Sequence, residues 1–128
     1  MSNIPSDLQY TRSHEWVRGL PNGQVEVGIT HHAQEALGDL VFVEVPQLDR
    51  RLTAGEPCAV VESVKAASDV YSPVSGRIVA SNDDLAQRPE LLNQDPYGAG
   101  WLIRIELDTS APRGALLTAA EYAQFLAE

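Results

Sequence analysis

The stretch Glu62-Ser63-Val64-Lys65-Ala66-Ala67-Ser68-Asp69-Val70-Tyr71-Ser72-Pro73-Val74-Ser75-Gly76 decides the fold of this chain. The apolar run Ala59-Val60-Val61 leads into it and predicts a buried strand. A second strand is expected to leave it through Val70, Ser72 and Val74. We therefore expect a hairpin over about residues 59–75 that carries Lys65 at its tip.

Lys65 is the only lysine of the chain, since the other eight basic residues are arginines. Small residues follow it, in the order Ala66, Ala67, Ser68, and would let the tip enter a narrow cleft of another protein. A carrier with a swinging arm needs an exposed amine of this kind on a rigid support. Acylation would also remove the positive charge of the amine. The alternative is an ordinary solvent-exposed lysine in a turn, and the hairpin alone does not separate the two.

The segments before the hairpin predict more β-structure. Residues 24–30 alternate with Val25, Val27 and Ile29 on one face, and the turn at residues 21–23 joins them to a partner strand at residues 16–18. Thr30 is the expected N-cap of a short helix that ends at Gly38. That helix would turn Ala33, Ala36 and Leu37 inward, and a strand at residues 40–45 follows it.

Further strands are expected at residues 58–63, 69–71, 76–80 and 101–107, with short helical turns between residues 82 and 93. Thr118 and Glu121 have the spacing of a capping box, which predicts a C-terminal helix over about residues 118–127. Many short strands with one terminal helix indicate a mostly β fold, a small sandwich or barrel with helical additions. The length of 128 residues is typical of a single domain, residues 1–128.

Composition excludes several classes of function. The formal net charge of −9 argues against nucleic-acid binding. No run of apolar residues is long enough to span a membrane, and residues 1–7 do not resemble a signal peptide, so we expect a cytoplasmic protein. Cys58 is a lone cysteine in an apolar run and is expected to be a buried thiol. Adjacent His31 and His32 would point apart on a helix, so no metal site is expected.

Several blocks of the sequence resemble the glycine cleavage H proteins. The segment Glu62-Ser63-Val64-Lys65-Ala66 is similar to the lipoylation motif of that family. The resemblance extends from about Tyr10 to the C-terminal helix, and its other blocks are Ser13-His14-Glu15-Trp16, Gly28-Ile29-Thr30, residues 37–44, residues 68–76, residues 89–93, and residues 95–102. It implies the barrel-sandwich hybrid fold of lipoyl and biotinyl carriers, with short helices and a C-terminal helix.

The resemblance also implies a function without catalysis by the chain itself. Lipoic acid attached to Lys65 would carry an aminomethyl group from a pyridoxal-phosphate glycine decarboxylase to a tetrahydrofolate-dependent aminomethyltransferase, and electrons to dihydrolipoyl dehydrogenase. A lipoate ligase or an octanoyltransferase with lipoyl synthase would modify the lysine. These enzymes would recognise Glu62, Ser63, Val64 and Ala66.

The family resemblance further implies a cleft in which the loaded arm rests. Because an aminomethyl group is cationic, a carboxylate in the cleft would hold it. Glu15 is the first candidate, and Ser13 and Asp69 are further candidates; each has a structural alternative, as a solvated charge, a cap or a turn residue. The sequence departs from the family at Asp49, where glycine is usual, and at Ala36, where some members have a polar side chain.

Other functions stay open at this point. A lipoyl domain of a 2-oxoacid dehydrogenase or a biotin carrier would resemble Asp-Lys-Ala or Met-Lys-Met around the lysine, whereas this chain has Val64-Lys65-Ala66. An H-protein paralogue that relays lipoyl groups to other enzymes is the main alternative. An enzyme is disfavoured because no catalytic Ser/His/Asp order or phosphate-binding loop occurs in the sequence.

Overall fold

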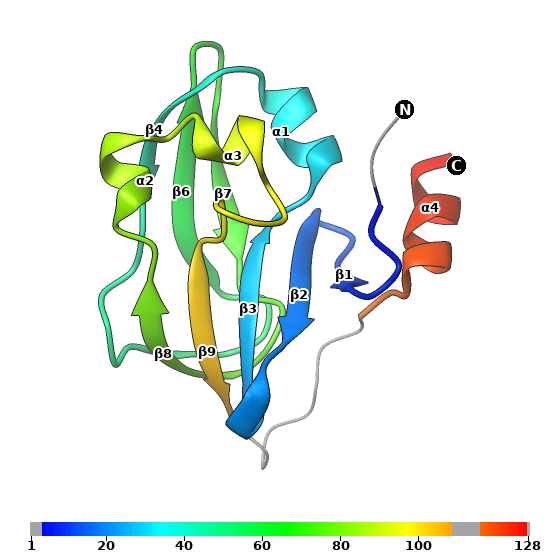
Figure 1. Cartoon of the computed structure of the whole chain (residues 1–128), viewed down its shortest axis with the longest axis vertical. Coiled ribbons are helices and arrows are strands. Elements are labelled where there is room, and N and C mark those ends of the chain that lie inside the picture. The colour runs from blue at the N-terminus through cyan, green and yellow to red at the C-terminus, as the bar shows by residue number, and fades with distance from the viewer. Residues whose placement is uncertain (1–3, 109–115, 128) are drawn as a thin grey trace.

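The computed structural model describes residues 4–108 and 116–127, which form two antiparallel sheets with short helices around one end (Figure 1). The larger sheet has the strand order β1-β2-β3-β9-β8-β5 and the smaller the order β4-β6-β7. The strands are β1 (Gln9–Tyr10), β2 (Glu15–Gly19), β3 (Gln24–Ile29), β4 (Leu40–Glu44), β5 (Arg51–Leu52), β6 (Pro57–Ser63), β7 (Ala67–Tyr71), β8 (Gly76–Ser81) and β9 (Ile103–Leu107). The helices are a 3-10 turn η1 (Pro21–Gly23), α1 (His31–Leu37), α2 (Asp84–Gln87), α3 (Leu91–Gln94) and α4 (Ala119–Ala127).

The two sheets face each other and enclose the main hydrophobic core. Strand β3 contributes Val25, Val27 and Ile29 to this core, as the alternation in the sequence predicted. Val61 and Val70 enter it from the smaller sheet, and both are buried. Burial of these apolar side chains is the main stabilising contribution, at roughly 1.5–3 kcal/mol for each large one. The mostly β architecture expected from the sequence is confirmed.

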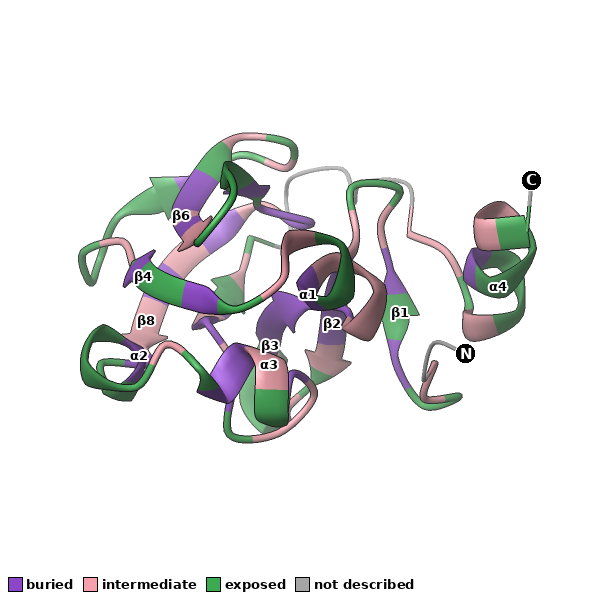
Figure 2. Ribbon diagram, turned by 90° about the horizontal axis from the view of Figure 1, so that it is seen from above, coloured by how far each residue is buried: buried purple, intermediate pink, exposed green. Residues whose placement is uncertain are grey.

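A second, aromatic cluster attaches the C-terminal helix to the sheet. Tyr122 of α4 stacks on Tyr10 of β1 with ring centroids 4.7 Å apart, and Trp16 and Leu8 complete the buried group. The Tyr122 hydroxyl lies 2.9 Å from Oγ1 of Thr30 and 2.7 Å from Nδ1 of His14. Figures 1 and 2 show α4 and β1 together at one side of the sandwich. Tyr122 is therefore the buried anchor of the helix, and Ala119, Phe125 and Leu126 pack around it.

Local signals read from the sequence give the helix ends correctly. The side chain of Thr30 accepts a hydrogen bond from the N–H of Ala33, and so caps α1. Gly38 closes α1 with φ of 85°, a conformation that favours glycine. Thr118 and Glu121 exchange the two hydrogen bonds of a capping box, at 2.9 and 3.2 Å.

Other expectations need correction. Ala36 is exposed, whereas Gln34 takes the buried position on α1, because a hydrogen bond from Asn93 of α3 satisfies its side-chain oxygen. Strands β1 and β5 were not predicted; each has only two residues, too few to show an alternating pattern. Asp49 adopts φ of 68°, so the unusual residue keeps a left-handed turn.

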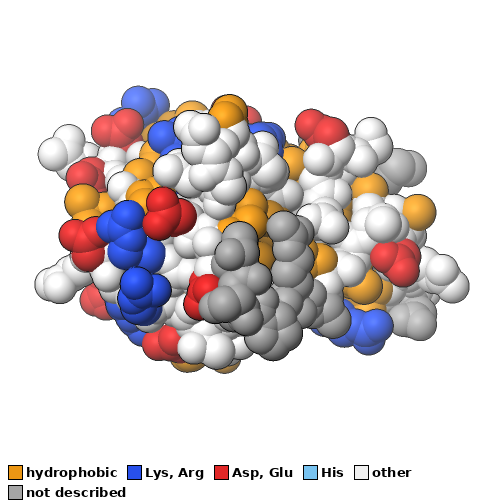
Figure 3. All heavy atoms as spheres, turned by 90° about the horizontal axis from the view of Figure 1, so that it is seen from below, with side chains coloured by type: hydrophobic (Ala, Val, Ile, Leu, Met, Phe, Trp, Pro, Cys, Tyr) orange, Lys and Arg blue, Asp and Glu red, His pale blue; other side chains and the backbone are white. Residues whose placement is uncertain are grey.

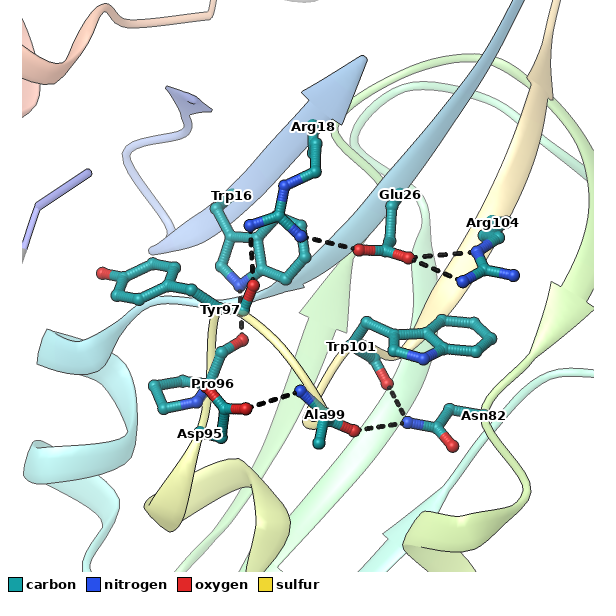
Figure 4. Close-up of polar contacts among 10 residues, drawn as sticks. All are labelled: Trp16, Arg18, Glu26, Asn82, Asp95, Pro96, Tyr97, Ala99, Trp101 and Arg104. Atoms are coloured by element: carbon teal, nitrogen blue, oxygen red, sulfur yellow. Dashed lines mark hydrogen bonds and ion pairs between the residues drawn. The ribbon is translucent and has the colours of Figure 1, made fainter. Parts of the chain in front are cut away.

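The loop after α3 is attached to the larger sheet by polar contacts (Figure 4). The indole N–H of Trp16 donates to the carbonyl of Pro96 at 2.9 Å, and Arg18 donates to the carbonyl of Tyr97 at 2.7 Å. Glu26 is buried at 6% exposure between two arginines, Arg18 and Arg104, which neutralise it. These contacts hold the Asp95–Trp101 loop, and with it α3, against the sheet.

The end of the molecule opposite the helices carries interleaved charges of both signs (Figure 3). Arg77 pairs with Asp49 and with Glu106, and Arg50 pairs with Glu56. Such exposed pairs contribute at most about 1 kcal/mol each. Among residues 4–108 and 116–127, no helix is both long and apolar enough to cross a membrane.

Candidate functional site

Strands β6 and β7 form the predicted hairpin, and Lys65 lies in the turn between them. The N–H of Ser63 donates to the carbonyl of Ala66 at 2.7 Å and closes the turn. The hydroxyl oxygen of Ser63 accepts from the N–H groups of Lys65 and Ala66 at 3.3 and 3.1 Å. Ser63 therefore shapes the turn through its side chain, a role that the sequence reasoning did not assign to it.

The tip of the hairpin is open to solvent although its strands are rigid. Val64 is 72% exposed, and Lys65, Ala66 and Ala67 are exposed as well. In contrast, Val61 and Val70 anchor the two strands in the core. Figure 1 shows the hairpin projecting past the helices at one end of the sandwich. This geometry places a single primary amine where a second protein can reach it.

The hairpin tip also rests on the turn between α1 and β4. The N–H of Val64 donates to the carbonyl of Asp39 at 3.2 Å. A Cβ added to Gly38 would lie 3.6 Å from Cε of Lys65, so the lysine side chain passes near this glycine with room for a methyl group between them. The sequence identified Gly38 as a helix terminator but did not indicate that the lysine side chain lies near it.

Glu15, the first candidate for the arm cleft, is buried at 2% exposure. Its Oε1 accepts from the hydroxyl groups of Thr11 and Ser13 at 2.6 Å each. Its Oε2 accepts from the N–H of Tyr71 at 3.3 Å, which connects β2 of the larger sheet with the end of β7 in the smaller one. The structure therefore brings Glu15 and Ser13 together, beside the strand that leaves the lysine turn.

Asp69 and Glu62 are placed on the hairpin strands. Asp69 is exposed and faces Val60 across the β6–β7 ladder. It lines a hollow of about 800 Å³ together with Glu44, Val60 and the loop at residues 45–50. Glu62 is half-buried and lies opposite Ala67 and Phe42. Within the described part of the chain, Asp69 makes no hydrogen bond to Ser13 or Glu15.

Exposed hydrophobic side chains gather around the smaller sheet. The large ones that remain exposed among the described residues are Val41, Phe42, Leu48, Val64 and Tyr71. They lie on β4, on the hairpin tip, at the end of β7 and on the adjoining loop at residues 45–50. Large exposed hydrophobic side chains on one sheet are candidates for contacts with a partner protein.

The remaining polar candidates have structural roles. Cys58 is buried, as expected, and this burial raises the pKa of its thiol to about 12. His31 contacts Glu35 and Gln34, whereas His32 packs against the ring of His14 at 4.6 Å, so the two histidines do point apart. No group of three or more His, Cys, Asp or Glu residues able to hold a metal occurs within the described ranges.

Known proteins are similar in sequence to this chain over its whole length. The family model described as "Glycine cleavage H-protein" matches residues 8–128. The chain belongs to the glycine cleavage H-protein family. A glycine cleavage system H protein of Aeromonas salmonicida is 57% identical over all of this chain and 99% of its own length. That of Halorhodospira halophila is 56% identical over 100% of this chain and 98% of its own length.

A solved H-protein structure has the same fold. The crystal structure of a glycine cleavage system H protein from Mycobacterium marinum superposes with a TM-score of 0.89 at 45% identity. The match covers 98% of this chain and 100% of the solved one. The family and the arrangement of two antiparallel sheets with short helices and a C-terminal helix, both expected from the sequence, are confirmed.

Proposed function

We propose that this protein is a non-catalytic lipoyl carrier of the glycine cleavage system and that Lys65 is its attachment residue. The observation that carries the proposal is the exposed single lysine at the tip of a hairpin whose strands are anchored in the core. A rigid support means that motion is confined to the lysine and the group attached to it.

The residues around Lys65 fit such a group. Ala66 and Ala67 are exposed and small, so they leave room for an enzyme to approach the amine. Amide formation would neutralise a cation that otherwise opposes entry into an apolar cleft. When bound, the lipoyl group would supply a dithiol/disulfide couple that carries an aminomethyl group and two electrons between enzymes.

Ser13 and Glu15 would receive the cationic end of the loaded arm. Ser13 is exposed, and its Oγ lies 2.6 Å from Oε1 of the buried Glu15. A cation that approaches from solvent would therefore contact the Ser13 hydroxyl and be attracted by the adjacent carboxylate. Asp69 would add a second carboxylate from the exposed side of β7. Charge-assisted hydrogen bonds of this type are stronger than neutral ones.

The partners proposed are the enzymes that load, unload, reoxidise and modify the arm. They are a pyridoxal-phosphate glycine decarboxylase, an aminomethyltransferase, dihydrolipoyl dehydrogenase, and the lipoate ligase or octanoyltransferase with lipoyl synthase. The exposed hydrophobic side chains on and beside the smaller sheet support docking of such partners. Glu62 and Val64 lie at the lysine turn itself or directly before it. The net charge of −9 favours partner surfaces that are basic.

Intact mass measurement tests the proposal. The purified protein is incubated with lipoate, ATP and a lipoate ligase, and its modified peptide is mapped. We expect one lipoyl adduct on Lys65 and none on K65R, which keeps the charge and should remain folded. A folded wild-type protein without adduct, beside an active ligase control, would refute the carrier function. Glycine decarboxylation by the purified protein alone would refute the non-catalytic role.

A reconstituted system separates the glycine pathway from a lipoyl relay. With the partner enzymes added, the lipoylated protein should support glycine decarboxylation. Intact lipoylation without activity in this assay would favour the relay.

A further inference from the structure

Asn93 of α3 makes three hydrogen bonds to the segment that supports the lysine turn. Its Oδ1 accepts from the N–H of Leu40 at 2.9 Å. Its Nδ2 donates to the carbonyl of Gly38 at 2.8 Å and to Oε1 of Gln34 at 3.0 Å. The amide side chain thus uses its oxygen and both of its N–H groups on α1 and the first residue of β4.

The residue between these contacts holds the hairpin tip. Asp39 lies between Gly38 and Leu40, and its carbonyl accepts the hydrogen bond from the N–H of Val64. The side chain of Lys65 lies near Gly38, with room for a methyl group between the two. The position of the lysine turn therefore depends on a short backbone segment, residues 38–40. Asn93 is hydrogen-bonded to both ends of this segment, at Gly38 and at Leu40.

Asn93 itself is fixed to the larger sheet. The loop that follows α3 is bonded to β2 through Trp16 with Pro96 and Arg18 with Tyr97 (Figure 4). The N–H of Asp95 also donates to the carbonyl of Leu91, which closes α3 directly after Asn93. A continuous set of hydrogen bonds thus joins the larger sheet, α3, the α1–β4 turn and the lysine hairpin.

We propose that Asn93 is a positioning residue for Lys65, which it keeps in the place where modifying and partner enzymes meet it; this inference rests on the proposed carrier function. Asn93 acts through the segment at residues 38–40. Without its bonds, that segment moves away from the Val64 N–H, and the tip spends only part of its time in the competent position. The apparent affinity of a partner falls in proportion to this fraction.

The variant N93D tests the proposal with little change in size. Aspartate keeps the oxygen that accepts from Leu40 but cannot donate to the Gly38 carbonyl or to Gln34. The matched control is N82D. Asn82 is a buried asparagine whose Nδ2 donates to the carbonyls of Ala99 and Trp101 at 2.8 Å each, at the end of the Asp95–Trp101 loop that is farther from α3 in the sequence; within the described residues it makes no hydrogen bond to α1, to residues 38–40 or to the hairpin. Both variants lose two donations from an amide side chain, so a general loss of stability affects both.

Two measurements follow on the full-length chain, in wild type and in both variants. The first is hydrogen exchange of the Val64 amide by NMR, normalised to amides of β3 and β9. The second is the KM and kcat of a lipoate ligase for the protein. For N93D we expect Val64 exchange to rise about tenfold and KM to rise by a similar factor, about 1.4 kcal/mol, with kcat within about twofold of wild type. N82D should change both measurements by less than about twofold once normalised, because the bonds of Trp16 to Pro96 and of Arg18 to Tyr97 still hold the loop next to α3.

Equal effects of N93D and N82D, or an unchanged Val64 exchange rate in N93D, would overturn the positioning role. A loss of kcat with unchanged KM would also overturn it, because a partly populated tip lowers apparent affinity instead. If wild-type Lys65 takes up no lipoyl group, the carrier function fails, and the Val64 exchange rate still decides the role of Asn93.

Discussion

Replacing Glu15 by glutamine should destabilise the protein by about 2–4 kcal/mol, because each hydrogen bond to a buried charged group contributes about 1.5–3 kcal/mol. Both carboxylate oxygens accept in the structure, Oε1 from the hydroxyls of Thr11 and Ser13 and Oε2 from the N–H of Tyr71. Glutamine carries no charge, so these contacts become neutral hydrogen bonds of about 0.5–1.5 kcal/mol each, and unless its NH2 group turns toward the hydroxyls, which can accept as well as donate, the N–H of Tyr71 also loses its acceptor. The carboxylate is 2% exposed, so water does not replace the lost partner.

Urea unfolding followed by tryptophan fluorescence measures the effect, since Trp16 is buried directly after Glu15. The midpoint should fall while the slope stays unchanged, because the surface exposed on unfolding is the same. The variant should remain folded, given a typical domain stability of about 5–15 kcal/mol. E35Q is the control. The side chain of Glu35 is 64% exposed, and among the described residues its ion-pair partner is His31, so the loss of this pair should change stability by less than about 0.5 kcal/mol.

An E15Q protein as stable as E35Q would show that the link from β2 to β7 does not stabilise the fold. Glu15 would then be free of a structural role, and its proposed contact with the loaded arm would be the remaining reason for a carboxylate at this position.

Three further outcomes follow from buried or strained positions. Y122F should lower the free energy of unfolding by about 1–3 kcal/mol, because His14 and Thr30 lose the hydroxyl group that contacts both of them. Among all elements, the backbone amides of α4 should show the largest rise in hydrogen exchange. Wild-type exchange rates in α4 would contradict the anchoring role of this hydroxyl. The unfolding free energy of D49G should stay within about 1 kcal/mol of wild type, whereas D49V should lose about 1–2 kcal/mol, because residue 49 has φ of 68°, which a β-branched side chain disfavours. A higher melting temperature for D49V than for D49G would refute this. Burial first, and then His32, lower the pKa of His14 below 6.5, so the unfolded chain binds the proton more readily. The stability supplied by neutral His14 should therefore be present above about pH 6.5 and be lost as pH falls toward the folded pKa. Between pH 7 and pH 5, the urea midpoint of H14Q should fall less than that of wild type. An equal fall in both proteins would contradict this.

The sequence by itself determined those features that repeat along the chain or need only a few neighbouring residues. Strand β3 follows from alternating side chains, and the ends of α1 follow from Thr30 and Gly38. The hairpin with Lys65 at its tip follows from two apolar strands around a short polar turn. Such patterns are local because side-chain direction has a fixed period in strands and helices.

Only the tertiary structure decided which distant residues meet. Asn93 reaches Leu40 across 53 positions of the chain, and Glu15 reaches Tyr71 across 56. Ala36, expected to face inward, is exposed because Gln34 finds its hydrogen-bond partner on α3. A periodic pattern predicts which face of an element is buried, but the partner that a buried polar group needs comes from another element. For that reason the lysine could be found from the sequence, whereas the residues that hold it in place required the fold.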